Sequence, residues 1–211
     1  MPTSKILDGI NRFQDYYLEN ADLFQQLAEQ GQSPEVLFIG CSDSRVPLEV
    51  ITGAGPGDLF ILRNVANIVP PYGTGHMSVG AVLEYALLHL PLRHIVICGH
   101  TRCGGIEALD RDPDWVRASH IARWIEHARP AKTKIEAAGL EASARHLATV
   151  RENVLLQLEH LRSYDVVRER EKAGSLALHG WVYHLETGRI EAYNSGTGAW
   201  EAVGTQTEPG R

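Results

Sequence analysis

The sequence of 211 residues lacks several features that mark common classes of protein. It contains only 3 cysteines, an odd and small number that does not make a disulfide framework. No window approaches an uninterrupted apolar run of membrane length, and the start, MPTSKILDGINRFQDYY, shows no apolar core followed by a small-residue cleavage site. We therefore expect a cytoplasmic protein with no membrane partner, whose thiols are free or bind a metal.

An excess of basic residues is also missing. The chain has 26 acidic and 20 basic side chains, a net charge of −6, and no basic stripe. This balance disfavours nucleic acid or an anionic membrane as a partner. The hydrophobic fraction of 44% and the charged fraction of 22% are ordinary for a soluble globular protein, and the length fits one domain with an appended element.

Three short apolar runs predict β-strands, at 35–40 (EVLFIG), 57–64 (GDLFILRN) and 93–100 (RHIVICGH). The first and third are too continuously apolar for a sheet with one wet face, which indicates parallel strands covered on both sides. Between the second and third, residues 77–90 follow a helical period. The pattern is therefore β–α–β.

Later segments extend this pattern. Helical stretches are expected at 114–128 and 143–171, separated by Pro130, and then a strand at 175–186 turns into an antiparallel edge strand at 188–194. The predicted fold class is α/β, with a mostly parallel central sheet flanked by helices.

The chain before the first strand has its own pattern. From Ile6 to Leu27 apolar residues recur every three or four positions, which predicts one amphipathic helix or two stacked ones. Its apolar face must lie against the body of the domain or against another subunit. We therefore divide the chain into a helical arm (1–30), an α/β domain (31–203) and a polar tail (204–211).

Two strand ends carry the residues that suggest chemistry. Cys41 follows the first strand in LFIGCSDSRVP (37–47), and His100 and Cys103 flank a two-residue turn in CGHTRCGG (98–105). Sites in open parallel sheets form where loops leave the carboxyl ends of the strands, so two adjacent strands would bring these side chains together. Two thiolates and one imidazole are a natural zinc set that leaves the fourth tetrahedral position for another ligand.

Asp43 is the nearest candidate for that fourth position. It can bind the metal directly or, held by Arg45, accept a hydrogen bond from metal-bound hydroxide. Simpler interpretations exist for each residue: a strand-end Cys is usually a core residue, His100 could be a satisfied core histidine, and SDSR could be a turn with a solvated salt bridge. Their joint occurrence at two strand ends favours the metal site. Cys98, one pleat repeat before His100, we interpret as a buried inert thiol.

The spacing of these motifs resembles a known family. The pattern C-x-D-x-R, followed about sixty residues later by H-x-x-C-G-G, is similar to that of the β-class carbonic anhydrases. The resemblance covers roughly residues 1–195 and includes four further segments: GDLFILRNVANIVPP (57–71), EYALLHL (84–90), HIVICGHTRCGG (94–105) and LHGWVYHLETG (178–188).

The resemblance implies an enzyme, a carbonate dehydratase of the zinc lyase class. Its reaction is the reversible hydration of carbon dioxide to bicarbonate and a proton by hydroxide bound to Zn²⁺. Cys41, His100 and Cys103 match the family's zinc ligands. Asp43 and Arg45 match its catalytic dyad, in which Asp43 takes the fourth zinc position if the pair breaks.

The resemblance also assigns substrate-binding residues and an assembly. Gln32, Phe60, Tyr85 and the backbone of Gly104 match positions that contact carbon dioxide or bicarbonate. Taken alone, Gln32 would be a solvated helix-end residue, Phe60 strand core and Tyr85 helix core. The family further implies a homodimer, or a tetramer of two dimers, in which the arm at 1–30 wraps the partner and the cleft lies at the subunit interface.

One position departs from the family pattern. Some bacterial members are inhibited by bicarbonate in a second pocket built around a Trp, an Arg and a Tyr. Here the Trp position is occupied by Phe38, while Arg63 and Tyr183 are at matching places. Phe lacks the indole N–H donor, so we expect weak or absent regulation of that kind.

Two other functions are compatible with the same residues. The first is hydrolysis of carbon disulfide or carbonyl sulfide by the same hydroxide. The second is a non-catalytic, zinc-stabilised interaction module in which Asp43 is permanently the fourth ligand, which would leave Arg45, Gln32 and Gly104 without a role. A thiol redox protein fits poorly because no C-x-x-C motif is present.

Overall fold

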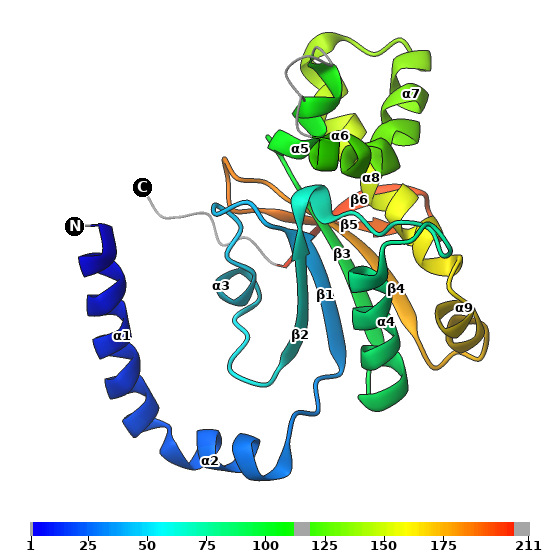
Figure 1. The fold of residues 1–211 in the computed structure, drawn as a ribbon. Coiled ribbons are helices and arrows are strands. Elements are labelled where there is room, and N and C mark those ends of the chain that lie inside the picture. The colour runs from blue at the N-terminus through cyan, green and yellow to red at the C-terminus, as the bar shows by residue number, and fades with distance from the viewer. Residues whose placement is uncertain (1, 112–118, 205–211) are drawn as a thin grey trace.

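A computed structural model describes residues 2–111 and 119–204 of the chain (Figure 1). Within these residues one sheet has the strand order β2-β1-β3-β4-β5-β6. The first four strands in this order run parallel, and β5 and β6 are antiparallel to their neighbours. The strands are β1 (Val36–Cys41), β2 (Leu59–Asn64), β3 (His94–His100), β4 (Ala177–Tyr183), β5 (Ile190–Asn194) and β6 (Ala199–Val203).

Helices precede, connect and cover these strands. The longer ones are α1 (Pro2–Glu19), α2 (Ala21–Gln30), α4 (Met77–His89), α6 (Ser119–Ile125), α7 (Arg129–Ala137), α8 (Ala142–Arg162) and α9 (Asp165–Lys172). The short ones are α3 (Leu48–Thr52), α5 (Gly104–Glu107) and the 3₁₀ turns η1 (Val65–Asn67), η2 (Ala108–Asp110) and η3 (Glu126–Ala128). None of the helices in the described residues is long and apolar enough to cross a membrane.

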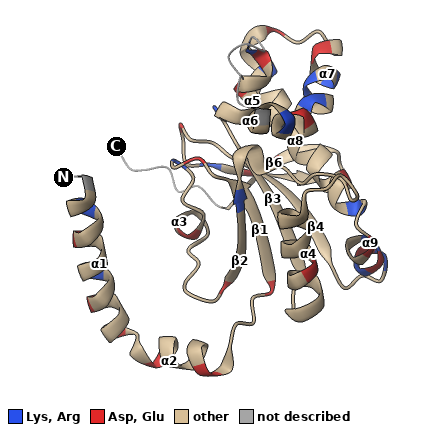
Figure 2. Ribbon diagram, in the orientation of Figure 1, with Lys and Arg blue, Asp and Glu red and all other residues tan. Residues whose placement is uncertain are grey.

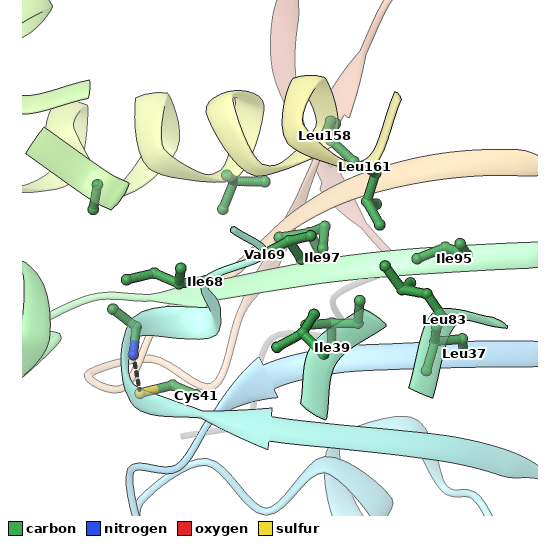
Figure 3. Packing of buried hydrophobic residues seen from close by; sticks show 14 of the residues in the cluster. Leu37, Ile39, Cys41, Ile68, Val69, Leu83, Ile95, Ile97, Leu158 and Leu161 are labelled. Atoms are coloured by element: carbon green, nitrogen blue, oxygen red, sulfur yellow. Dashed lines mark hydrogen bonds between the residues drawn. The ribbon is translucent and has the colours of Figure 1, made fainter. Parts of the chain in front are cut away.

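The predicted fold class is confirmed, and the buried strands explain why. Almost every residue of β1 and β3 is buried, as their continuous apolar sequences predict. On one face, alternate residues of these strands form one buried cluster with residues of α4, α8 and α9. Figure 3 shows Ile95 and Ile97 between Leu83 of α4 and Leu158 and Leu161 of α8. On the other face, Phe38, Val96 and Cys98 pack with Val46 and Leu48 at the start of α3.

Two of the predicted elements differ in the structure. The antiparallel strand predicted at 188–194 is β5, but the edge of the sheet is β6, whose mostly exposed residues show no apolar alternation. The helix predicted at 143–171 is two helices, α8 and α9, which break at Ser163 and Tyr164. The break buries Tyr164, whose hydroxyl donates to Pro70 O at 2.9 Å.

Pro130 does not separate helices. It lies in the first turn of α7, where the missing N–H costs nothing because the first amide groups of a helix have no acceptor within it. The helix predicted from residue 114 is described from Ser119 onward as α6, and its first residues, like most of the tail predicted at 204–211, lie outside the described range.

The two N-terminal helices extend away from the sheet (Figure 1). Their apolar side chains remain largely exposed, namely Ile6, Leu7, Ile10, Phe13, Tyr16, Tyr17, Leu18 and Leu23. Phe13, Tyr16 and Tyr17 contact Phe24 through their rings, which joins α1 to α2 without covering the stripe. Figure 2 shows that charged residues of both signs are spread over the helices and are scarce on the strands.

Candidate metal centre

The three predicted ligands meet because β1 and β3 are direct neighbours. Their parallel register pairs Gly40 with Cys98, which places Cys41 beside the end of β3 that carries His100. The chain then turns through two residues to Cys103, which precedes the first residue of α5. The ligand atoms of Cys41, His100 and Cys103 all lie within 4.8 Å of one another, and the three residues are buried.

The imidazole of His100 is prepared to bind a metal. Its Nδ1 lies 2.9 Å from Thr101 O, and because a carbonyl only accepts, Nδ1 carries the proton. Nε2 is therefore the nitrogen with a free lone pair. It is buried and has no hydrogen-bond partner among the described residues. A buried nitrogen of this kind costs free energy unless a ligand such as a metal ion satisfies it.

The two thiols are within hydrogen-bond distance of each other, and this contact shifts their pKa values in opposite directions. Their sulfurs are 4.0 Å apart, and the hydrogen bond from Cys103 lowers the pKa of Cys41 to about 4. The same bond and burial raise the pKa of Cys103 well above its usual value. Cys41 Sγ also accepts the backbone N–H of Ala66 at 3.4 Å, the dashed line in Figure 3. The site therefore stabilises negative charge on sulfur.

The donor set fits zinc. Two sulfurs that each lie about 2.3 Å from a tetrahedral zinc ion are about 3.8 Å apart, close to the 4.0 Å between Cys41 and Cys103. Two thiolates and the free Nε2 of His100 supply three of four positions, which is the arrangement of an open rather than a closed site.

Asp43 is adjacent to this group and is engaged by Arg45. Its Oδ2 lies 3.8 Å from His100 Nε2. Arg45 donates to Oδ1 through Nε at 2.9 Å and to Oδ2 through Nη2 at 2.7 Å. The backbone N–H of Arg45 also donates to Oδ1 at 2.9 Å. These bonds hold the pKa of Asp43 well below its usual range, so the carboxylate is ionised. The group of ligand atoms that lie within 4.8 Å of one another contains Cys41, His100 and Cys103 but not Asp43.

Arg63 fixes the segment that carries these residues. Its guanidinium, on β2, donates to Cys41 O at 3.0 and 2.9 Å and to Asp43 O at 2.8 Å. Phe38 is buried and meets Trp181 edge-on, with ring centroids 5.9 Å apart. Tyr183 packs in the same cluster. Arg63 therefore holds the backbone of residues 41–43 in place through its hydrogen bonds to two carbonyl oxygens.

Three predicted substrate residues are not near the metal ligands of their own chain. Phe60 on β2 is paired with Leu37 on β1. Leu37 is four residues before Cys41, so Phe60 lies about 13 Å from the level of Cys41 along the strand direction. Tyr85 stacks on Phe60 with ring centroids 5.8 Å apart, and Gln32 is exposed before β1. Gly104 directly follows Cys103, and a Cβ there would meet no atom within 4 Å.

Cys98 takes no part in the group. It is buried on the opposite face of the sheet from Cys41, and burial raises its pKa to about 12. The interpretation of Cys98 as a buried thiol is confirmed. By contrast, the sequence reasoning did not single out Thr101, Arg102 or Glu186, which hold the loop between two of the ligands. In the sequence these residues stood out only as parts of the matching segments 94–105 and 178–188, with no role of their own.

Comparison with known proteins gives a consistent result. Residues 36–190 match the model of the family described as carbonic anhydrase. The chain is 43% identical over 189 residues to a carbonic anhydrase of Pseudomonas aeruginosa, covering 89% of this chain and 86% of that protein. It is 37% identical over 194 residues to a carbonic anhydrase of Synechocystis sp., covering 90% and 70%.

Solved structures are similar over nearly the whole chain. The β-carbonic anhydrase CcaA has a TM-score of 0.90 and 35% identity, covering 97% of this chain and 93% of its own. A tetrameric β-carbonic anhydrase of the filamentous ascomycete Sordaria macrospora has a TM-score of 0.81 and 33% identity, covering 90% and 96%.

Replacing a ligand should remove the metal, whereas replacing the other buried thiol should not. We expect Cys103→Ser to lose most bound zinc, because one of three protein donors is weakened. Cys98→Ser is the matched control and should keep about one zinc per chain. Elemental analysis after loading and dialysis measures both. Equal loss from the two variants would contradict the assignment of the site.

Proposed function

The chain belongs to the β-class carbonic anhydrase family, and from this membership and its site we propose that it hydrates carbon dioxide reversibly to bicarbonate and a proton at a zinc ion. The ion would be held by Cys41, His100 and Cys103. The observation that carries the proposal is their convergence within 4.8 Å, with His100 Nε2 buried and unpartnered in the described structure.

Zinc, when bound, would supply an activated water molecule near neutral pH. The ionised Asp43 can only accept hydrogen bonds, and its Oδ2 lies on the side of His100 Nε2. We propose that it accepts a hydrogen bond from the attacking water molecule and so orients a lone pair of the water oxygen toward carbon dioxide. Arg45 restrains both carboxylate oxygens and keeps Asp43 from occupying the fourth position itself.

The backbone beside Cys103 would contact the substrate. Gly104 carries no side chain, and the space where a Cβ would lie is open. Its N–H is thus accessible to an oxygen of carbon dioxide or bicarbonate. We propose this N–H as the donor that fixes the substrate oxygen.

Gln32, Phe60 and Tyr85 would serve the site of a second copy of the chain. Phe60 and Tyr85 lie at the amino end of the parallel strands, far from the ligands at the carboxyl end. A single chain therefore cannot bring them to its own metal. In a two-fold dimer each chain can present this end to the partner, which would complete both sites.

The exposed stripe of the N-terminal helices supports the same assembly. Residues 1–30 would form a dimerisation arm, because an apolar surface of this extent requires a partner. The arm extends from the sheet instead of folding onto it (Figure 1). The Sordaria macrospora relative is tetrameric, so two such dimers per assembly are also part of the proposal.

The activity is tested by stopped-flow carbon dioxide hydration with a pH indicator, on protein of known zinc content between about pH 6.5 and 9. We expect fast turnover that rises with pH, because deprotonation of the attacking water is favoured at high pH. Zinc-loaded protein without turnover anywhere in this range would contradict the proposed function.

Asp43→Asn separates orientation from metal binding. The amide has lost one acceptor oxygen and the charge that Arg45 holds, so kcat should fall by about 100-fold or more. Zinc content should stay unchanged, since Asp43 is not a ligand in the open site. Elemental analysis and stopped flow on the same samples decide this, and a variant that loses zinc would show that Asp43 binds the metal.

Mixed dimers test whether Gln32 acts across the interface. Gln32→Ala and Cys103→Ser chains, each with its own affinity tag, should be nearly inactive alone. The purified heterodimer should regain about half of the wild-type activity, because one of its two sites combines intact ligands with an intact Gln32 from the partner. A heterodimer as inactive as its parents would place Gln32 in its own chain's site.

Bicarbonate should inhibit without strong cooperativity. Phe38 replaces a donor of the second pocket, and the guanidinium of Arg63 is already bonded to Cys41 O and Asp43 O. An initial-rate titration with bicarbonate should thus follow simple product inhibition. A steep, sigmoidal loss of activity would overturn this expectation.

A further inference from the structure

The two residues between His100 and Cys103 adopt a backbone that needs outside support. Arg102 has φ 53°, in the left-handed region that L side chains other than Asn and Asp rarely adopt. No glycine is present in this turn to lower the cost. The conformation must be held by contacts, and both neighbours of the turn are metal ligands.

Glu186 provides those contacts from a distant part of the chain. It lies in the turn between β4 and β5, and its Oε2 accepts the hydroxyl of Thr101 at 2.7 Å while its Oε1 accepts Arg102 Nε at 2.9 Å. The Thr101 hydroxyl in turn accepts the N–H of Leu185 at 3.0 Å. One carboxylate thus binds both residues of the turn at once.

The carbonyl groups of the same two residues face the metal centre. Thr101 O accepts Nδ1 of His100 at 2.9 Å, which leaves Nε2 free for the metal. Arg102 O accepts Nη2 of Arg45 at 3.0 Å, and that nitrogen also binds Asp43. The direction of each carbonyl is set by the backbone conformation that Glu186 restrains.

We propose that Glu186 is a positioning residue for the metal centre: by binding Thr101 and Arg102 it fixes the two carbonyls that orient His100 and Arg45. The assignment rests on the proposed function in that the oriented groups are the proposed zinc ligand and the partner of Asp43. It extends that function, because Glu186 binds the two residues between His100 and Cys103 and not the proposed ligands themselves.

An ordinary surface salt bridge is the competing explanation. The side chain of Glu186 is 46% exposed, and exposed ion pairs contribute little to stability. Glu126 offers a matched control, since it is 53% exposed and also forms a multiply hydrogen-bonded pair with an arginine, Arg129, away from the centre. A purely electrostatic surface role would make the two glutamates equivalent.

The rate of zinc release to an excess of a chromogenic chelator tests the proposal without relying on turnover. Removing an outer partner of metal ligands typically weakens metal binding 10- to 100-fold, so Glu186→Ala should release zinc about tenfold faster or more. Glu186→Gln keeps one acceptor oxygen, so its rate of zinc release should lie between those of the wild type and Glu186→Ala. Glu126→Gln should match the wild type.

Two further variants show the route of the effect. Thr101→Val removes the hydroxyl and should also accelerate release, and Thr101→Val with Glu186→Ala should be less than additive because both break one network. In the cobalt-substituted protein, Glu186→Ala should change the visible spectrum, which reports the metal's coordination. The spectral change caused by Glu186→Ala should be smaller in an Asp43→Asn background, because part of the effect of Glu186 passes through Arg102 O and Arg45 to Asp43.

Failure of the positioning role can be distinguished from failure of the proposed carbon dioxide hydration. The positioning role would be overturned, even in an active enzyme, if Glu186→Ala and Glu186→Gln released zinc at a rate within about twofold of the wild type. It would also be overturned if Glu126→Gln accelerated zinc release as much as the Glu186 variants do. Wild-type protein that does not hydrate carbon dioxide, yet shows the expected release pattern, would overturn the proposed function and leave the positioning of the metal site intact.

Discussion

The parallel pairing of β1 with β3 is the constraint on which the site depends. Both strands are nearly fully buried, so their register is set by packing on two faces. Because parallel strands end at the same edge, that register brings Cys41 level with the end of β3 and so within reach of His100 and Cys103. A shift of one residue would turn Cys41 to the opposite face, away from Cys103.

The polar groups at this edge form a continuous set of restraints around the three ligands. Arg63 binds the backbone carbonyls of Cys41 and Asp43. Arg45 binds the Asp43 carboxylate and the backbone carbonyl of Arg102. Each charged group therefore satisfies a carbonyl or a carboxylate, which limits the cost of placing charge beside a buried centre. The arrangement holds the Asp43 carboxylate close to the three proposed ligands and engages both of its oxygens with Arg45.

The apolar surface in the rest of the described structure is buried in one part of the molecule and exposed in another. Helices α4, α8 and α9 cover one face of the sheet completely enough to bury its core. The arm and the amino end of the sheet keep large apolar side chains exposed, among them Phe13, Leu18 and Tyr85. Such surfaces are unfavourable in water, and this exposure is the physical basis of the proposed dimer. In that proposal, a second copy of the chain covers the exposed apolar surface and supplies the substrate-binding residues missing from each site.

The sequence by itself determined the parallel strands and predicted the three candidate metal ligands, because both leave local signatures. Continuous apolar runs identify buried strands, and Cys41, His100 and Cys103 follow those runs directly. The resemblance of the motifs then identified the family. Local patterns also misled where burial is weak or where a residue has two uses, as at the exposed β6 and at Pro130, which starts a helix as readily as it ends one.

Only the tertiary structure decided which distant groups hold the site. The position of Glu186 next to Thr101 follows from the pairing of β3 with β4, which joins segments 85 residues apart. The same holds for Arg63 on β2, whose side chain binds backbone carbonyls that have no sequence signature. A hydrogen bond to a backbone group depends on position and not on residue type, and for that reason it is invisible until the chain is folded.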